Sequence, residues 1–370
     1  MFDFIEAHDY TPYFNYAVLI LLIFTLIQCW GGIALQKGTA RMNAGWGLAV
    51  VIILILYMGL RPVSSVFGDT MVYAAGFNRD AASTEPFHWY WRGEWAFGNL
   101  TRWLAKMTDI HGYFLCCATI YVGALWLAMV RMFRSYYYIP FLVIICMFTF
   151  WAYGTNGIRN GMGASLFILA MTYVENLPVA VVLSLLATGC HQSVWMMVGA
   201  AVLAYFVKNS YYYLAGWLLC VIISYFLGDT IQAYIAGMGM FEDNTRFTDY
   251  LNVSNIDTEV IQMEIGFRWD FLAYSAVPVV LGWYFIFKRD FLDEYYHWIY
   301  NVYIVTNAIW VLVIRASYSN RLAQISWFIM PLVLIYPFMK KRFWENHEQM
   351  LGYAMVLFYA FTFYYNIVKG

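Results

Sequence analysis

Two ionisable residues, Arg159 and His191, stand in sequence that is otherwise apolar. Arg159 belongs to the stretch Tyr153-Gly-Thr-Asn-Gly-Ile-Arg-Asn-Gly-Met-Gly-Ala-Ser165, where one apolar run ends and the next begins, and His191 interrupts a run rich in Val and Leu. At membrane depth an ionisable group costs about 2.5–3.5 kcal/mol on insertion scales. Such residues have either a structural role, as a snorkelling arginine or a histidine bonded to a neighbouring helix, or a functional one.

The functional alternative is anion chemistry. A guanidinium keeps its charge at physiological pH and binds phosphate through paired donors, so arginines around a membrane cavity favour a diphosphate. An imidazole nearby adds a base for an acceptor hydroxyl, or a hydrogen-bond donor to the diphosphate. Asp69 and Glu94 are alternative bases. With no Asp-x-Asp or His-x-x-x-His pattern and no nucleotide-binding motif, we expect neither a metal nor a cofactor.

The composition identifies the class of protein. The chain is 63% hydrophobic and only 12% charged, whereas about a quarter of a soluble protein is charged. Its apolar stretches suit helices across a hydrocarbon core of about 30 Å, and the alternating segments of an outer-membrane barrel are absent. We therefore predict an all-α, polytopic integral membrane protein with a single helical-bundle domain over residues 1–370, without linkers or internal repeats.

The apolar runs predict about twelve transmembrane helices of roughly 17–25 residues, some of them short or broken. The two runs beside His191 are too short for full spans at about 1.5 Å per residue, which predicts a tilted, broken or re-entrant arrangement there. The predicted helices lie near residues 12–30, 44–60, 111–130, 137–153, 160–175, 178–190, 193–207, 211–228, 270–287, 298–314, 323–339 and 350–368.

Short connections with paired basic residues orient the chain, because such clusters stay in the cytoplasm. Lys340-Lys-Arg342, Lys288-Arg289 and the pair Arg131 and Arg134 define that face. The opposite, extracytoplasmic face then receives both long loops, about 61–110 and 229–269. It also receives His191 and a set of arginines that includes Arg61, Arg159, Arg268, Arg315 and Arg321.

Within the first long loop, the stretch Glu94–Lys106 intersperses Trp and Leu with charged residues, which predicts an interfacial amphipathic helix. Gly157, Gly161 and Gly163 give the helix of Arg159 a small-residue face, which favours close helix packing. Arg61 follows the second apolar run and is interpreted as a headgroup anchor.

Five segments together resemble the EpsG-like branch of Wzy-type polysaccharide polymerases. Arg159-Asn-Gly-Met-Gly-Ala-Ser165 followed about thirty residues later by His191-Gln-Ser193 is similar to the family's Arg-led helix and His-x-Ser. The other three are Gly68-Asp-Thr-Met-Val-Tyr73, Glu94-Trp-Ala-Phe97 and Ser319-Asn-Arg321. Two departures are Asp69 directly after Gly68, and Trp95-Ala96 where the family has Pro-Gly.

The resemblance implies polymerisation of an O-antigen, capsule or exopolysaccharide. Such enzymes sit in the inner membrane and face the periplasm or cell exterior, where they transfer a glycan from an undecaprenyl-diphosphate carrier to a lipid-linked repeat unit. A flippase and a chain-length regulator are the implied partners, with no nucleic acid. The catalytic candidates are His191, Asp69 and Glu94. The candidates for substrate and diphosphate binding are Arg159, Arg321, Arg268, Arg315, Tyr73, Asn160 and Ser193.

Other classes of membrane protein stay open as alternatives. A glycan ligase or another polyprenyl-phosphate-dependent glycosyltransferase needs the same groups. An O-acyltransferase also pairs a buried histidine with many helices, but it predicts access to His191 from the cytoplasm. A flippase or transporter predicts repeated halves and cations along a central path, whereas the arginines here gather on one face.

The topology predicts that both long loops are extracytoplasmic. Cysteines introduced at Asn78 and Asn255 should react with an impermeant thiol reagent on intact cells, once the reagent has passed any outer membrane. Labelling of these positions only after lysis would reverse the orientation.

Overall fold

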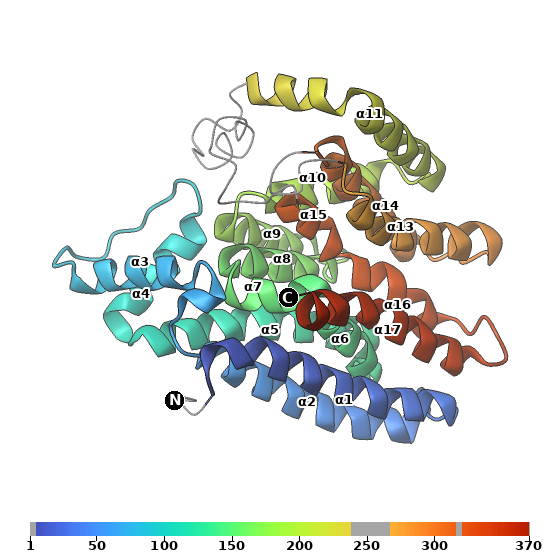
Figure 1. Cartoon of the computed structure of the whole chain (residues 1–370), viewed down its shortest axis with the longest axis horizontal. Helices are drawn as coiled ribbons and strands as arrows, with labels where there is room; N and C mark the ends of the chain where they lie inside the picture. The colour runs from blue at the N-terminus through green and yellow to red at the C-terminus, as the bar shows by residue number, and fades with distance from the viewer. Residues whose placement is uncertain (1–4, 238–266, 316–319, 370) are drawn as a thin grey trace. The chain divides into compact units, whose positions relative to one another are not determined.

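The computed structural model describes residues 5–237, 267–315 and 320–369, and within these ranges every regular element is a helix (Figure 1). The predicted all-α class is therefore confirmed. Contacts divide the chain into two compact units, Met1–Val198 with Ile335–Gly370, and Gly199–Leu334. The single domain expected over residues 1–370 remains a prediction.

The first unit is a bundle of helices. Two helices, α10 (Val194–Phe206) and α16 (Met330–Lys340), begin in one unit and end in the other. The remaining helices of the first unit are α1 (Tyr10–Trp30), α2 (Lys37–Gly59), α3 (Thr70–Ala82), α4 (Trp95–Met107), α5 (Ile110–Phe133), α6 (Tyr138–Ile145), α7 (Phe148–Thr155), α8 (Ile158–Met171), α9 (Leu177–Cys190) and α17 (His347–Phe363).

Helix α5 is the centre of this unit, because α2 and α8 both pack on it and α8 in turn packs on α9. Glycines make these approaches close. A Cβ on Gly59 would lie 2.6 Å from the Cα of Leu115, and one on Gly163 would lie 2.8 Å from the Ala187 carbonyl oxygen. The small-residue face expected on the helix of Arg159 is thus used for packing, as predicted.

The second unit contains four further helices, α11 (Ser210–Gly237), α13 (Trp269–Trp283), α14 (Glu294–Leu312) and α15 (Asn320–Trp327). Buried polar side chains join them. Asn307 of α14 accepts a hydrogen bond from Trp217 at 2.8 Å and donates one to Ser326 at 3.0 Å. Such internal pairing satisfies polar groups that lipid could not.

In the described residues, seven helices are long and apolar enough to cross a membrane, and α6 with α7 could form an eighth span bent by 75°. The expected number of about twelve spans is therefore not confirmed. One reason is the run 137–153, which breaks between α6 and α7. Another is that α8, α9 and α10 have only 14, 14 and 13 residues, about 20 Å of helix, which is shorter than a hydrocarbon core.

The break predicted at His191 is confirmed, because α9 ends at Cys190 and α10 begins at Val194. The amphipathic helix predicted over Glu94–Lys106 is confirmed as α4 (Trp95–Met107). In contrast, the second long loop does not begin at residue 229, since α11 continues to Gly237. The side of the membrane on which either loop lies remains a prediction.

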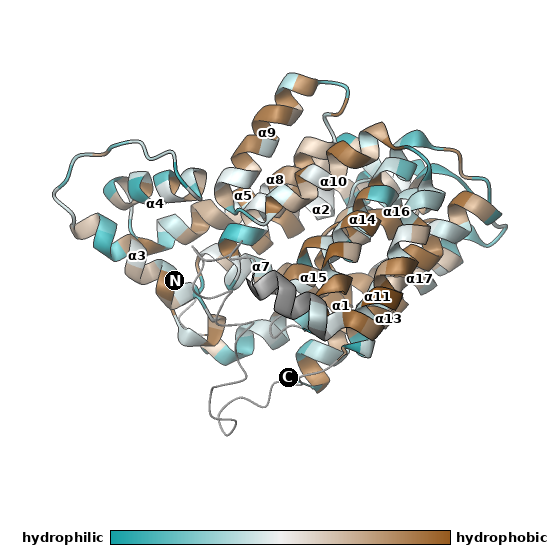
Figure 2. Cartoon of the chain, turned by 90° about the horizontal axis from the view of Figure 1, so that it is seen from above, coloured by the Kyte–Doolittle hydropathy of each residue, from teal (hydrophilic) through white to brown (hydrophobic). Residues whose placement is uncertain are grey.

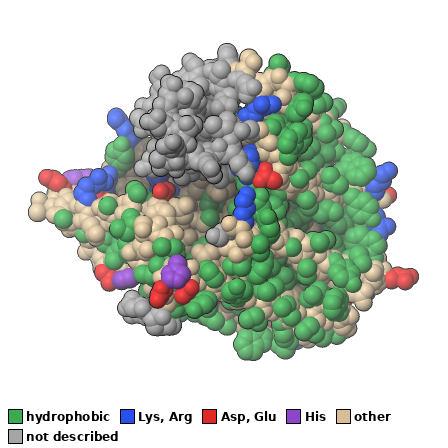
Figure 3. Space-filling model, in the orientation of Figure 1, with side chains coloured by type: hydrophobic (Ala, Val, Ile, Leu, Met, Phe, Trp, Pro, Cys, Tyr) green, Lys and Arg blue, Asp and Glu red, His purple; other side chains and the backbone are tan. Residues whose placement is uncertain are grey.

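The surface of the first unit distinguishes its lipid-like helices from its mixed ones. Figure 2 shows α9 as largely hydrophobic and α3 and α4 as mixed. Large apolar side chains such as Ile20 and Ile27 of α1 and Ile53 of α2 are 62–67% exposed, and hydrophobic side chains cover the region of these two helices in Figure 3. Exposed apolar faces of this extent suit contact with lipid.

Candidate active site

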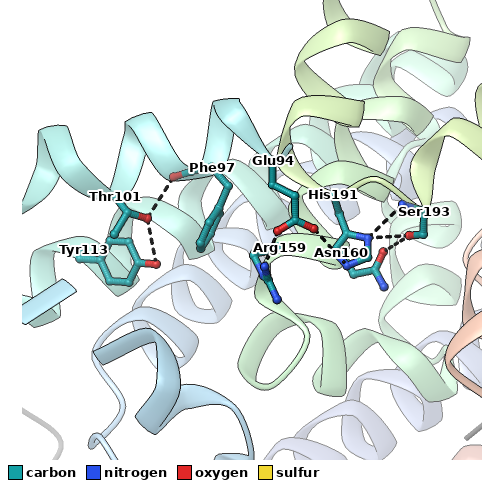
Figure 4. Close-up of polar contacts among 8 residues, drawn as sticks. All are labelled: Glu94, Phe97, Thr101, Tyr113, Arg159, Asn160, His191 and Ser193. Carbon is teal, nitrogen blue, oxygen red and sulfur yellow. Dashed lines mark hydrogen bonds and ion pairs between the residues drawn. The ribbon is translucent and has the colours of Figure 1, made fainter. Parts of the chain in front are cut away.

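Glu94 connects the two residues that the sequence singled out. One carboxylate oxygen, Oε2, accepts a hydrogen bond from Arg159 Nη1, and the other, Oε1, lies 3.4 Å from His191 Nε2 (Figure 4). The three side chains come from the start of α4, the first turn of α8 and the junction of α9 with α10. We call Glu94, Arg159 and His191 the ionic cluster.

The local fold leaves the Glu94 carboxylate available for these contacts. Glu94 is the N-cap residue of α4, but its side chain makes no capping hydrogen bond. The Glu94 side chain is only 20% exposed, and the backbone N–H of Gln192 also donates to it. Burial raises the pKa of the Glu94 carboxyl, and Arg159 and Gln192 oppose this effect without cancelling it.

Arg159 lies beside an aromatic ring as well as a carboxylate. Its guanidinium carbon is 5.7 Å from the ring centroid of Tyr73, and the Tyr73 hydroxyl is hydrogen-bonded to Arg159. The Arg159 side chain is 34% exposed, so the guanidinium is held in place and still faces open space. A planar fork of donors in such a position suits a phosphate or diphosphate.

Neighbouring groups contact both ring nitrogens of His191. The backbone nitrogen of Ser193 lies 3.2 Å from Nδ1, and Nε2 faces Glu94 at 3.4 Å. Ser193 Oγ lies 2.7 Å from the same Nδ1 and donates to Asn160 Oδ1 at 2.8 Å. Two further residues suggested by the family resemblance, Asn160 and Ser193, therefore orient His191 in this structure.

Asp69 is not a member of the ionic cluster, but its charge acts on the neighbouring Tyr73. It is the N-cap residue of α3, one turn before Tyr73, and its backbone N–H donates to Asn156 Oδ1 at 2.8 Å. Gly68 has φ +58°, and a Cβ there would lie 2.5 Å from the same amide oxygen. The 68–70 turn thus requires glycine and fastens α3 to the turn that precedes Arg159.

A buried arginine that sequence reasoning misread holds this turn together. Arg61 is 1% exposed, not at the headgroups as interpreted from the sequence. It donates to Thr70 Oγ1 at 2.9 Å and to the Thr155 carbonyl oxygen at 3.0 Å, while Thr70 Oγ1 donates to the same carbonyl at 2.8 Å. The ring of Phe114 lies 4.7 Å from its guanidinium carbon. We call Arg61, Thr70 and Thr155 the arginine clamp.

The electrostatics of the arginine clamp are unusual for a buried ion. Its hydrogen-bond acceptors are carbonyls and a hydroxyl rather than a carboxylate, and burial lowers the pKa of Arg61 to about 10. The guanidinium is therefore still charged at neutral pH. Because Thr155 is four residues before Arg159, this charge fixes the backbone from which the ionic cluster is built.

Three predicted diphosphate ligands lie in the second unit, and their assignment stays a prediction. Arg268 forms a paired salt bridge with Asp270, with N–O distances of 3.0 and 2.8 Å. Arg315 donates to the Tyr225 carbonyl at 3.0 Å. Arg321 belongs to α15, but its side chain lies outside the part of the chain that the structure describes.

In the described ranges, no group of three or more His, Cys, Asp or Glu side chains is placed to hold a metal ion. The fold and the site together define a polytopic helical membrane protein in which short, broken helices hold an arginine beside a carboxylate and an imidazole. A family model described as the EpsG family matches residues 46–370, so the chain belongs to the EpsG family. No curated protein and no solved structure matches it.

The arginine clamp predicts that Arg61→Lys destabilises the protein, although charge is conserved. A single ammonium cannot reach acceptors that the guanidinium fork spans, and each charge-assisted hydrogen bond lost costs about 1.5–3 kcal/mol. Thermal unfolding in detergent, followed by size-exclusion fluorescence, should show a lower midpoint for Arg61→Lys. Arg79→Lys, at an exposed position of α3, serves as the control. Equal midpoints for the two variants would contradict the clamp.

Proposed function

We propose that this EpsG-family protein is a polysaccharide polymerase. It transfers a growing glycan from a polyprenyl-diphosphate carrier, undecaprenyl diphosphate in bacteria, to a hydroxyl of a lipid-linked repeat unit, and so assembles an O-antigen, capsule or exopolysaccharide. The observation that carries the proposal is the ionic cluster. It combines a cation for a departing diphosphate with a base for an attacking hydroxyl, next to apolar helices that suit a lipid carrier.

In the proposed reaction, Arg159 exchanges its carboxylate partner for the donor diphosphate. The acceptor hydroxyl loses its proton to the base, and its oxygen forms a bond to the anomeric carbon of the donor sugar. The bond from that carbon to the diphosphate oxygen breaks, and the electron pair leaves with the diphosphate. Arg159 stabilises the negative charge that develops there, which is a pre-organised electrostatic contribution.

The cluster geometry favours Glu94 as the base. Ser193 occupies Nδ1 of His191, and Nε2 lies 3.4 Å from Glu94 Oε1, so protein groups occupy both ring nitrogens. In this arrangement His191 orients the carboxylate rather than accepting a proton from the substrate. Burial, which raises the pKa of Glu94, makes it a stronger base than an exposed carboxylate. Asp69 remains a candidate for binding or base catalysis at the edge of the site.

The orientation proposed for this reaction is the extracytoplasmic face of the inner membrane. It follows from the distribution of basic residues in the loops. A flippase that delivers lipid-linked units and a regulator of chain length are the proposed partners in the same assembly.

Arg159→Lys should lose most polymerisation in an assay with purified protein and lipid-linked repeat units. Lysine keeps the charge but lacks the paired donors that fit a diphosphate, and loss of one such contact costs about 1.5–3 kcal/mol, roughly a tenfold to hundredfold change in rate. Arg131→Lys is the matched control, because its guanidinium contacts Thr172 at 3.1 Å away from the ionic cluster. Full-length polymer from Arg159→Lys would show that only charge or packing matters there.

A pH profile separates the two candidate bases. If Glu94 is the base, the rate should fall as the pH drops below the pKa of Glu94. Because that pKa is raised, the fall should occur at a pH above the ordinary glutamate pKa of about 4.3. Glu94→Gln should lower the rate by about 10²–10⁴-fold and remove this acid limb, whereas His191→Gln, which still donates a hydrogen bond, should keep the limb.

Protonation of Glu94 does not cause the protein to unfold, so unfolding driven by this residue cannot produce the acid limb. A carboxyl whose pKa is higher in the folded protein binds its proton more tightly there, so protonation at low pH favours the folded state. If His191→Gln abolished the rate and Glu94→Gln retained it, the histidine would be the base.

A further inference from the structure

A continuous line of aromatic rings leads along the chain toward the ionic cluster. The ring centroids of Phe87 and Trp89 are 5.3 Å apart, those of Trp89 and Trp91 5.8 Å, and those of Trp91 and Trp95 5.0 Å. Trp89 and Trp91 are stacked with an interplanar angle of 19°. They are also 64% and 67% exposed. We call these four residues the aromatic strip.

The backbone beneath the aromatic strip is fixed. The side chain of Asn99, which is 3% exposed, accepts a hydrogen bond from the Tyr90 N–H at 3.0 Å and donates one to the Tyr90 carbonyl at 2.7 Å. The Tyr90 ring lies 5.2 Å from the guanidinium carbon of Arg102. The backbone that carries the exposed tryptophans is therefore held in place before any ligand arrives, which lowers the entropic cost of binding.

The two ends of the aromatic strip meet different polar features. At one end Phe87 lines a cavity of about 280 Å³, together with His88, Arg102 and Lys106. At the other end Trp95 directly follows Glu94. A Cβ on Gly189 would lie 2.6 Å from the Trp95 ring, so this indole packs close to the end of α9, two residues before His191. The strip thus connects a polar cavity with the ionic cluster.

The charges around the aromatic strip favour a sugar chain over lipid tails. Acidic and basic side chains, Asp80 and Glu85 with Arg102 and Lys106, line the cavity at its Phe87 end. Ions of both signs beside acyl chains would be costly. The exposed faces of α1 and α2 instead carry Ile, Leu and Phe. A pyranose ring has an apolar C–H face, which suits an aromatic face, and a rim of hydroxyls, which suits charged and polar neighbours.

We propose that the aromatic strip is a binding site for the glycan of the substrate, with sugar rings stacked on Trp89 and Trp91. This inference rests on the proposed function, and it adds a glycan-binding site beyond the ionic cluster. The strip holds a chain of several sugar units while the reacting end lies at Glu94, Arg159 and His191. Its loss should therefore weaken glycan binding and shorten the polymer, without removing a group that takes part in bond formation.

The test measures binding of a defined probe, the repeat-unit oligosaccharide released from its lipid by mild acid, to purified protein in nanodiscs. Titration calorimetry should show binding about tenfold weaker for the double variant Trp89→Ala/Trp91→Ala. The conservative double variant Trp89→Phe/Trp91→Phe should keep most of the affinity. Trp46→Ala removes an indole that is 63% exposed on α2 and should bind as the unsubstituted protein does. Monodisperse elution confirms that each variant is folded.

Two outcomes would overturn the inference. One is unchanged oligosaccharide affinity in the folded double alanine variant. The other is strong quenching of Trp89 and Trp91 by brominated lipid in the nanodisc, obtained by difference from that variant, which would identify a membrane anchor. If the oligosaccharide binds through the two tryptophans but lipid-linked units are not polymerised by the unsubstituted protein, the glycan site stands and the proposed function fails.

Discussion

The site depends on one carboxylate that serves two partners. Glu94 binds Arg159 through one oxygen and faces Nε2 of His191 through the other. In a partly buried place, an arginine without a counterion would be costly, and a carboxylate without a donor equally so. The ion pair between Glu94 and Arg159 is therefore stable in the absence of substrate. In the proposed reaction a diphosphate replaces Glu94 as the partner of Arg159, because it offers the guanidinium the same geometry with more charge. Substrate binding would then release Glu94 at the moment a base is needed.

Such a cluster in a membrane protein requires helices that end early. Continuous spans satisfy their own backbone groups and leave few polar contacts, whereas helix ends expose N–H groups and carbonyls. Here Arg159 lies in the first turn of α8, His191 directly follows α9, and the backbone N–H groups of Gln192 and Ser193 bind Glu94 and His191. The short length of α8, α9 and α10 is thus part of the site, because it brings backbone donors to the ionic cluster.

The part of this site that could be predicted is the part that contrasts with its sequence surroundings. Arg159 and His191 stood out because their neighbours are apolar, and the break at His191 followed from the shortness of the flanking runs. Arg61 did not stand out, since an arginine at the end of a span ordinarily reaches the headgroups, whereas one of its actual acceptors, the Thr155 carbonyl, is 94 residues away in sequence. The expected number of about twelve spans is not confirmed for a related reason. Apolar composition alone does not show where a helix bends, as it does between α6 and α7.

The segment from Phe87 to Trp95 joins the proposed glycan site to the proposed catalytic site. Its aromatic rings and its carboxylate share one short stretch of backbone, which Asn99 fastens at Tyr90 and which Trp95 fastens at Gly189. A displacement of the rings along this stretch would therefore be transmitted to Glu94 and to both of its partners. Since a misplacement of about 1 Å can cost a hundredfold in rate, the rigidity of the segment matters as much as the residues that it presents. The arginine clamp adds to this rigidity, because it holds the turn before Arg159 and so fixes the opposite side of the ionic cluster.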